Sequence, residues 1–408
     1  MTDIEHWTND IHTGDAAGTL AELPESSVHM VMTSPPYFGL RDYGVDGQIG
    51  LEESLDEYIS ELVGVFREVR RVLRPDGSAW LNLGDSYATA RSDHTGGDRV
   101  GGAPGEDYAT RSEGALGRKN KMLVPHRVAI ALQEDGWIVR NDVTWVKPNP
   151  MPSSVKDRLN TTTEQVFMLA PNPDYWFDLD SIREEYKQYD VADNQVDRSE
   201  EIKGKGELAD DTCRELRGRE EKKKEMYHPA GKNPGDVFEV TTKPFPEAHF
   251  AVYPPELVET PLKATCPPKV CAECGSPYDR DVERERVKRN EPRGTERSED
   301  ADMAQSVDRS PVTNGSKYWE RLKNRKTEFK GWTPTCDCDT DATEAGIALD
   351  PFAGAGTTAL VAKRYGRRFI GIDLNEEYVA MAQKRLGLTV DNPEHVRDDA
   401  DAGLEDFA

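Results

Sequence analysis

The sequence predicts an α/β protein built on a doubly wound, parallel sheet, with smaller segments inserted into it. Three observations favour this class. Short apolar runs typical of buried strands alternate with helical patterns along much of the chain. A glycine-rich turn joins a strand to a helix near the carboxyl end. The length of 408 residues exceeds that of one ordinary domain, so a large sheet and appended modules both have room.

The amino-terminal part of the chain supplies the first strands and helix. Residues 28–32 form an apolar run typical of a buried strand, and two prolines after it turn the chain outward. A helix is expected over 55–73, because Ser54 and Glu57 form a capping box and apolar residues recur on one face. A Pro-Asp-Gly turn ends this helix, and residues 79–83 are expected to form the next strand.

The remaining elements are separated by stretches without apolar periodicity. Residues 88–121 are rich in Gly, Arg and Ser and are expected to form a mobile loop. Two polar stretches, 184–235 and 281–330, are not expected to belong to the sheet. Apolar patterns predict a helix over 124–132, strands over 137–145, 163–169, 346–350 and 369–373, and a last helix that ends at Leu386.

Composition limits the class of protein further. No apolar run approaches the ~18 residues that cross a membrane, and the acidic amino terminus lacks an apolar signal segment. We therefore expect a cytoplasmic protein with no membrane partner. The net charge of −24 argues at face value against nucleic-acid binding, since Lys and Arg make phosphate contacts. The acidic excess is spread over the whole chain, which favours a salt-adapted protein over an acidic mesophilic one.

A ligand-binding turn is predicted at residues 350–358, whose sequence is Asp-Pro-Phe-Ala-Gly-Ala-Gly-Thr-Thr. The glycines would let the backbone approach a ligand, and Asp373, about 20 residues further on, is placed to bind ribose hydroxyls. An acid and an aromatic ring before the glycines suit a pyrophosphate poorly. They favour S-adenosylmethionine, which has no phosphate, carries a sulfonium cation and offers an adenine ring. A nicotinamide cofactor is the alternative.

A second turn, residues 33–37, has the groups needed to hold a planar base that carries an amine. Its sequence is Thr-Ser-Pro-Pro-Tyr. The Ser34 hydroxyl and the Pro35 carbonyl are hydrogen-bond acceptors, and Tyr37 offers a stacking face for a flipped-out base. Accepting N–H hydrogen bonds orients the lone pair of an amine that is otherwise a poor nucleophile. The prolines keep the turn rigid, so that the amine can meet a methyl donor in line.

Taken together, these two turns resemble those of the amino-methylating DNA methyltransferases, and their order resembles the circularly permuted β group. The similarity extends over residues 84–87, 136–137, 145–153, Arg158, Glu164, 175–178 and 249–254. The resemblance implies a permuted, Rossmann-like methyltransferase sheet, double-stranded DNA as substrate and S-adenosylmethionine as cofactor. It implies catalytic roles for Ser34, Pro35, Pro36 and Tyr37. It implies cofactor binding by Asp15, Asp350, Pro351, Phe352, Gly354, Gly356, Thr357, Thr358 and Asp373.

The resemblance also bears on the methylated atom. In this family Ser-Pro-Pro-Tyr favours cytosine N4 and Asp-Pro-Pro-Tyr favours adenine N6, so cytosine N4 is expected and adenine N6 is the second choice. Cytosine C5 is excluded, because it needs a Cys nucleophile after Pro and none of the six cysteines follows a proline. We expect a role in restriction-modification or genome marking, a cognate endonuclease as partner, a monomer or homodimer, and a haloarchaeal source. A nicotinamide-dependent dehydrogenase and a non-catalytic DNA-binding protein are remoter alternatives.

Four cysteines form two close pairs, Cys271 with Cys274 and Cys336 with Cys338. Four thiolates at two such turns suit a tetrahedral structural zinc ion, and the cytoplasm disfavours disulfides. The alternatives are free buried cysteines or a disulfide. Cys213 and Cys266 are expected to be structural or incidental.

These motifs divide the chain into six expected regions. They are 1–183, the catalytic half with the base-holding turn; 184–235, target recognition; 236–265, flanking the cofactor site; 266–345, a zinc-ribbon-like insert; 346–390, the cofactor-binding half; and 391–408, an acidic tail. Region 184–235 is expected to recognise the DNA sequence, because it holds the densest basic cluster of the chain. That cluster is Arg214, Arg217, Arg219, Lys222, Lys223 and Lys224. A solvated charged helix is the alternative.

Overall fold

The computed structural model describes residues 4–40, 44–88, 116–117, 119–185, 230–243, 252–284 and 327–388. Two compact units are present. The first comprises Met1–Ser181, Gly235–Asp279 and Pro334–Phe407, and the second comprises Ile182–Pro234, Arg280–Thr333 and Ala408. Most of the expected loop at 88–121, most of both polar stretches, the tail at 391–408 and Cys213 lie outside the described residues. Within the described ranges, no helix has the length and apolar character needed to cross a membrane.

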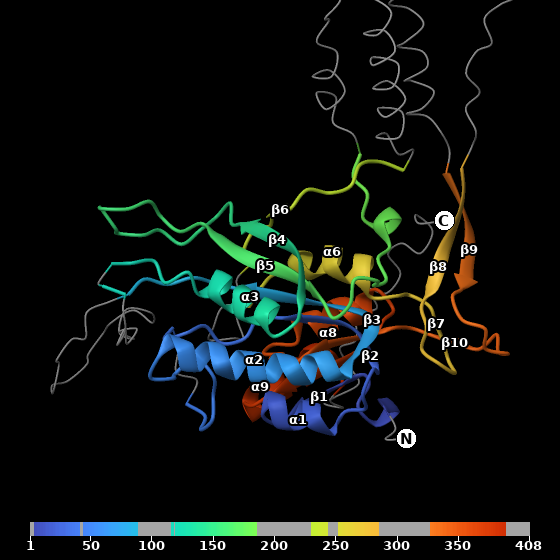
Figure 1. Ribbon diagram of the computed structural model, residues 1–408, viewed down its shortest axis with the longest axis horizontal. Coiled ribbons are helices and arrows are strands. Elements are labelled where there is room, and N and C mark those ends of the chain that lie inside the picture. Colours follow the sequence, from blue (N-terminus) through green and yellow to red (C-terminus); the bar gives the residue numbers. More distant parts are fainter. Residues whose placement is uncertain are drawn as a thin grey trace, which may run out of the picture. The chain divides into compact units, whose positions relative to one another are not determined.

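An eight-stranded sheet forms the centre of the first unit (Figure 1). Its strands, in spatial order, are β1 (Asp10–Thr13), β12 (Arg368–Asp373), β11 (Ile347–Asp350), β2 (Val28–Thr33), β3 (Leu73–Leu83), β5 (Thr163–Ala170), β4 (Ile138–Val146) and β6 (Val237–Glu239). Neighbouring strands from β1 to β3 are all parallel, and β4 is parallel to β6.

One strand departs from the parallel sheet that the sequence predicts. β5 runs antiparallel to both of its neighbours, β3 and β4. The connection from β4 to β5 contains no helix, and a parallel pairing would need a crossover, usually through a helix. The doubly wound class is confirmed, but the sheet is mixed. As a result, the amino end of β5 lies at the same edge as the carboxyl ends of β2 and β3.

Helices cover both faces of the sheet (Figure 1). On one face lie α1 (Ala16–Glu22), α2 (Leu55–Val72) and α3 (Val124–Glu134), and on the other lie α6 (Pro255–Thr265), α8 (Thr357–Arg364) and α9 (Glu376–Arg385). The short 3-10 turns are η1 (Ile4–His6) and η2 (Leu179–Ser181). Strand β2 shows why both faces need cover: Val31 packs in one core, whereas Met30 and Met32 pack in the other.

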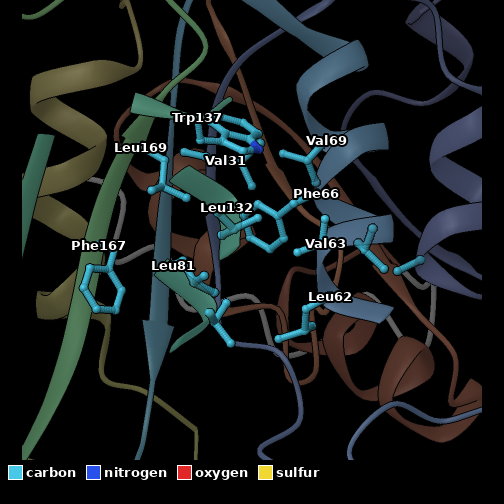
Figure 2. Packing of buried hydrophobic residues seen from close by; sticks show 14 of the residues in the cluster. Val31, Leu62, Val63, Phe66, Val69, Leu81, Leu132, Trp137, Phe167 and Leu169 are labelled. Carbon is cyan, nitrogen blue, oxygen red and sulfur yellow. The ribbon is translucent and has the colours of Figure 1, made fainter. Parts of the chain in front are cut away.

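Helix α2 is defined by its own sequence. The predicted capping box is present, with Ser54 and Glu57 each accepting a hydrogen bond from the backbone of the other at 3.2 Å. Phe66 and Val69 are fully buried, and Figure 2 shows Phe66 pointing from α2 into the core. The Phe66 ring meets Trp137 edge-on, with ring centroids 6.1 Å apart.

Strand β3 begins earlier than predicted. It starts at Leu73, directly after α2, and includes the Pro-Asp-Gly segment that the sequence assigned to a turn. That segment is accommodated as a shift in register: Val28 of β2 pairs with Leu73, and Met30 pairs with Ser78. The irregularity lies at the amino ends of both strands, far from their carboxyl ends.

Two short ribbons complete the described structure. β7 (Val270–Cys271) pairs antiparallel with β10 (Thr343–Glu344). β8 (Tyr278–Arg284) pairs with β9 (Thr327–Pro334). Both ribbons lie in the part of the sequence between α6 and β11.

Candidate active site

The two predicted turns meet at the carboxyl edge of the sheet. Thr33 ends β2, and Asp350 ends the adjacent parallel strand β11. The Thr33 hydroxyl donates a hydrogen bond of 2.7 Å to Asp350 Oδ1, and both side chains are buried. Residues 34–37 and 351–355, which follow these strands, line one cavity of about 760 Å³, a size typical of small-molecule sites. Its lining also includes Asp15, Asn82, Trp145, Lys147, Glu164, Tyr253, Thr357, Asp373 and Tyr378.

A polar network supports the Ser34 turn. Ser34 Oγ donates to the Tyr37 hydroxyl at 3.3 Å, and that hydroxyl donates to Glu164 Oε2 at 2.8 Å. The Asn82 amide lies within hydrogen-bonding distance of all three groups, at 3.2, 2.9 and 3.1 Å respectively. Lys147 forms an ion pair with the other oxygen of Glu164. Members of the network therefore come from the edge shared by β2, β3, β4 and β5.

Two further contacts hold Tyr37 and its turn in place. The Tyr58 hydroxyl, on α2, donates to the Pro36 carbonyl at 2.9 Å. A Cβ atom added at Gly84 would lie 2.5 Å from the Tyr37 ring, so this glycine allows the ring its position. Burial, together with the Glu164 carboxylate, raises the pKa of Tyr37 well above its ordinary value of 10. Tyr37 therefore keeps its proton and acts as a hydrogen-bond donor.

The glycine turn forms another part of the cavity wall. Gly354 has a φ of +50°, and a Cβ atom added there would meet no atom within 4 Å. Its N–H donates to Asp373 Oδ2 at 2.8 Å, and the N–H of Asn375 donates to Asp373 Oδ1 at 2.9 Å. Burial raises the pKa of Asp373, while these two hydrogen bonds oppose the rise. The backbone thus fixes an acidic side chain at the cavity wall.

Asp350 and Thr358 lie behind this wall and do not line the cavity. Asp350 Oδ2 accepts a hydrogen bond of 2.7 Å from the Tyr253 hydroxyl, which also lies 2.6 Å from Thr358 Oγ1. Thr358 Oγ1 donates to the Met32 carbonyl at 3.0 Å. Burial raises the pKa of Asp350, opposed first by the hydrogen bond from Thr33 and then by that from Tyr253. These side chains hold β2, β11 and α8 together.

The other predicted cofactor residues divide between lining and packing positions. Asp15 lines the cavity and also caps α1, with Oδ1 accepting from the Gly18 N–H at 2.7 Å. Gly356, with a φ of +72°, is a packing position, because a Cβ atom there would lie 3.0 Å from the Ala382 Cβ atom. Pro351, Phe352 and Thr357 line the cavity.

Sequence reasoning did not single out Asn82 or Tyr253 as site residues. Asn82 is 1% exposed and is the one polar residue in the run 79–83 of β3. A lone polar residue in a buried apolar run is the signal that could have revealed it. Tyr253 entered only through the family resemblance, as did Lys147 and Glu164, because their contacts are made across the sheet and not along the sequence.

The structure also brings the four paired cysteines together, away from the cavity. The Sγ atoms of Cys271, Cys274, Cys336 and Cys338 all lie within 4.8 Å of one another. None of these residues lines the cavity. Cys266 is fully buried outside this cluster.

Comparison with known proteins places this site in a family. A family model described as DNA methylase, for N6 and N4 methyltransferases, matches residues 28–270 and 341–384. Type II methyltransferase M.SfiI of Streptomyces fimbriatus is 34% identical over 402 residues, covering 90% of this chain and 89% of that protein. Type II methyltransferase M.Cfr9I of Citrobacter freundii is 31% identical over 375 residues, with 91% and 86% covered.

Among solved structures, the cytosine-N4-specific PvuII DNA methyltransferase aligns with 94% of this chain and 87% of its own, at 17% identity and a TM-score of 0.48. The sequence relationships carry the assignment. Both turns that line the cavity fall within the matched residues, the first in 28–270 and the second in 341–384. The chain therefore belongs to the amino-methyltransferase family of DNA methylases and is an S-adenosylmethionine-dependent DNA methyltransferase.

Proposed function

We propose that this methyltransferase is site-specific and methylates the N4 amine of cytosine in double-stranded DNA. The observation that carries the proposal is the neutral hydroxyl of Ser34, at the turn that shares a cavity with the glycine turn. In the family that the sequence resembles, Ser at this position accompanies cytosine N4 and Asp accompanies adenine N6. Adenine N6 is therefore the alternative atom.

The contacts of Ser34 leave it able to bind an amine. Its hydroxyl donates to Tyr37 and accepts from Asn82, which uses one of its two lone pairs. The second lone pair can accept one N–H of the cytosine amine, and the Pro35 carbonyl is assigned to the other. Engaging both N–H groups directs the nitrogen lone pair toward the methyl donor and lowers the entropic barrier. A cytosine turned out of the duplex would stack on the Tyr37 ring.

Glu164 and Lys147 are assigned as positioning residues for this turn. The Glu164 carboxylate accepts from the Tyr37 hydroxyl, and the Lys147 ammonium balances its charge. The network thereby holds the Tyr37 ring and the Ser34 hydroxyl in one arrangement. Neither charged group is assigned a direct contact with the base.

The residues at the glycine turn fit S-adenosylmethionine. The open space at Gly354 allows close approach of a ligand to the backbone. We assign Asp373 to the ribose hydroxyls, and Phe352 and Asp15 to the adenine. When bound, S-adenosylmethionine supplies an electrophilic methyl group on a sulfonium centre. Asp350, Gly356 and Thr358 are assigned to holding the turn, because they lie behind the cavity wall or in a packing position.

Sequence recognition is assigned to residues 184–235, most of which lie outside the described residues. The assignment is supported by the basic cluster in this stretch and by its place between the two turn-bearing halves. Replacing the stretch with that of a relative of different specificity should change the methylated site and leave the methylated atom unchanged. An unchanged site would move the recognition role to residues 266–345.

A restriction-modification role is supported by the relatives, which are Type II methyltransferases. Methylation by this protein would protect its site against a cognate endonuclease. DNA from a host that expresses the protein should resist a restriction endonuclease that cuts at the methylated site. It should remain sensitive to endonucleases that cut at other sites.

Modified-base sequencing of DNA from such a host tests the function directly. We expect methylation at cytosine N4 within one short recognition sequence. Methylation at adenine N6 within a short sequence would replace the first assignment with the second. DNA without any modification, from a host producing folded protein, would contradict both.

A further inference from the structure

The four clustered cysteines form a site that the methyltransferase reaction does not use. We propose that Cys271, Cys274, Cys336 and Cys338 bind one structural zinc ion through four thiolates. Their Sγ atoms lie within 4.8 Å of one another. A tetrahedron with zinc–sulfur bonds of about 2.3 Å has sulfur–sulfur edges of about 3.8 Å, so little movement is needed to complete it.

The backbone around the first pair has the form of a metal-binding turn. The N–H of Gly275 donates to the Cys271 carbonyl at 2.8 Å, and the N–H of Cys271 donates to the Ser276 carbonyl at 2.9 Å. Gly275 has a φ of +70°, which favours glycine at this position. A hydrogen bond of 3.2 Å joins Cys274 Sγ to Ser276 Oγ. The chain thus turns back after two residues and presents both sulfur atoms on one side.

The second pair is brought to the first by separate contacts. Thr335, beside Cys336, donates from its hydroxyl to the Pro277 carbonyl at 2.6 Å. After Cys338 the chain enters β10, where Thr343 pairs with Cys271 of β7. These contacts bring the Cys336–Cys338 pair next to the Cys271–Cys274 pair, although about 60 residues separate the two pairs in the sequence.

A metal at this position would anchor the turn on the sheet. The Gly275 carbonyl lies 3.0 Å from Nε2 of His29, in β2, and the N–H of Ile347, the first residue of β11, donates to His29 Nδ1 at 3.1 Å. Arg74 donates to the Cys274 carbonyl at 2.9 Å. These contacts lie at the amino ends of β2, β3 and β11, the opposite edge from Thr33 and Asp350. Zinc would act on stability and not on methyl transfer.

The four sulfur ligands suit a structural zinc ion. Four thiolates give a closed tetrahedral shell with no open position, as in structural zinc sites, and soft sulfur ligands disfavour magnesium and calcium. Binding would release the thiol protons and stabilise the folded chain. The cysteine segment also lies outside the family match, which stops at residue 270 and resumes at 341. The site thus lies outside the residues that the family model matches.

Metal analysis of the purified full-length protein tests the proposal without any substitution. We expect about one zinc ion per chain. A mercurial reagent should release this zinc in proportion to its reaction with the four clustered thiols. Protein refolded with Co²⁺ should show the ligand-field and charge-transfer absorption of a tetrahedral tetrathiolate site. Folded protein that holds no zinc, takes up no cobalt in this geometry, or contains a disulfide among these cysteines would overturn the proposal.

Two substitutions with a matched control locate the metal. Cys336→Ser and Cys338→Ser should reduce the zinc content to less than about a tenth of the wild-type value. Cys266→Ser, which changes a buried cysteine outside the cluster, should retain all of it. If the cluster variants fail to fold, the thiol titration and cobalt spectrum of the wild type still decide the question. Full zinc content in folded cluster variants would show that the metal binds elsewhere.

Discussion

The hydroxyl of Thr33 donates a 2.7 Å hydrogen bond to the carboxylate of Asp350, although the two residues are 317 positions apart in the sequence. They are the last residues of two neighbouring parallel strands, and each leads into one of the two turns that line the cavity. The spacing between the turns is thus set by strand pairing and this buried contact. The spacing between the two turns does not depend on how far apart they are in the sequence or on which of them comes first.

The base-holding turn should control turnover and leave cofactor binding unchanged. Tyr37→Ala and Pro35→Ala are expected to lower methyl transfer by about two orders of magnitude, because stacking and rigid placement of the base are lost. The Kd for S-adenosylmethionine, measured by calorimetry, should remain near the wild-type value. Tyr37→Phe, which keeps the ring, should lose less activity than Tyr37→Ala. Unchanged turnover in Tyr37→Ala would remove this residue from the site.

Glu164 should act through Tyr37 without binding the base. Glu164→Gln keeps the shape of the side chain but removes the negative charge that pairs with Lys147 and that strengthens the hydrogen bond from the Tyr37 hydroxyl. We expect kcat to fall by about tenfold, with the Kd for S-adenosylmethionine and the thermal unfolding midpoint preserved. A loss confined to thermal stability would show that the network serves folding alone.

Gly354 should be needed for cofactor binding. Gly354→Val places a branched side chain in the cavity and strains a backbone with φ of +50°. We expect no measurable binding of S-adenosylmethionine. Gly366→Val is the matched control: its φ is +63°, it also has no atom within 4 Å of an added Cβ, and it does not line the cavity. The Gly366→Val control should bind S-adenosylmethionine normally, even if its stability drops by a similar amount; loss of binding in both variants would show that strain alone explains the result.

His29 should make stability depend on pH. Burial lowers the pKa of His29 from 6.5 to about 4. Its neutral ring can donate from Nε2 to the Gly275 carbonyl and accept at Nδ1 from the N–H of Ile347. Protonation of Nδ1 would break the second hydrogen bond. The unfolded chain therefore takes up this proton more readily than the folded one, so stability falls as pH drops below 6.5 and levels off below about 4.

Unfolding measurements on a paired variant isolate this effect. Between about pH 7.5 and 5.5, wild type should lose on the order of 1 kcal/mol more stability than His29→Gln. Gln cannot titrate, and its amide can still donate to the Gly275 carbonyl. Identical pH profiles for the two proteins would show that His29 does not titrate differently on folding.

The net charge of −24 should make folding depend on salt. Dispersed negative charge repels itself when unscreened, and the Debye length falls to about 3 Å at 1 M salt. We expect the thermal unfolding midpoint and methyl transfer to rise together between about 0.05 M and 2 M potassium chloride. High stability and full activity at the lower concentration would rule out the salt-adapted interpretation.

Local sequence was sufficient to predict the elements that carry their own boundaries. Helix α2 has a capping box at Ser54 and an apolar face. The capping box starts the helix, and the apolar face is buried, as the sequence predicts. The strands before the two turns are apolar runs ended by proline. These signals act over a few residues, so tertiary contacts do not alter them.

The direction of β5 could not be predicted in this way. An apolar run gives no direction, and in a wholly parallel sheet Glu164 would lie at the opposite edge from Ser34. Because β5 is antiparallel, its amino end brings Glu164 to the site. Asn82 carries no local signal of its role for a related reason, since its partners lie in β5 and in the turn after β2.

Nucleoside analysis by mass spectrometry identifies the methylated base and the methylated atom directly. Plasmid DNA would be incubated with purified protein and S-adenosylmethionine, digested to nucleosides and compared with a Pro35→Ala control. We expect N4-methyldeoxycytidine in the wild-type sample and a much smaller amount in the control. N6-methyldeoxyadenosine as the product of the wild-type protein would rule out cytosine N4 as the methylated atom.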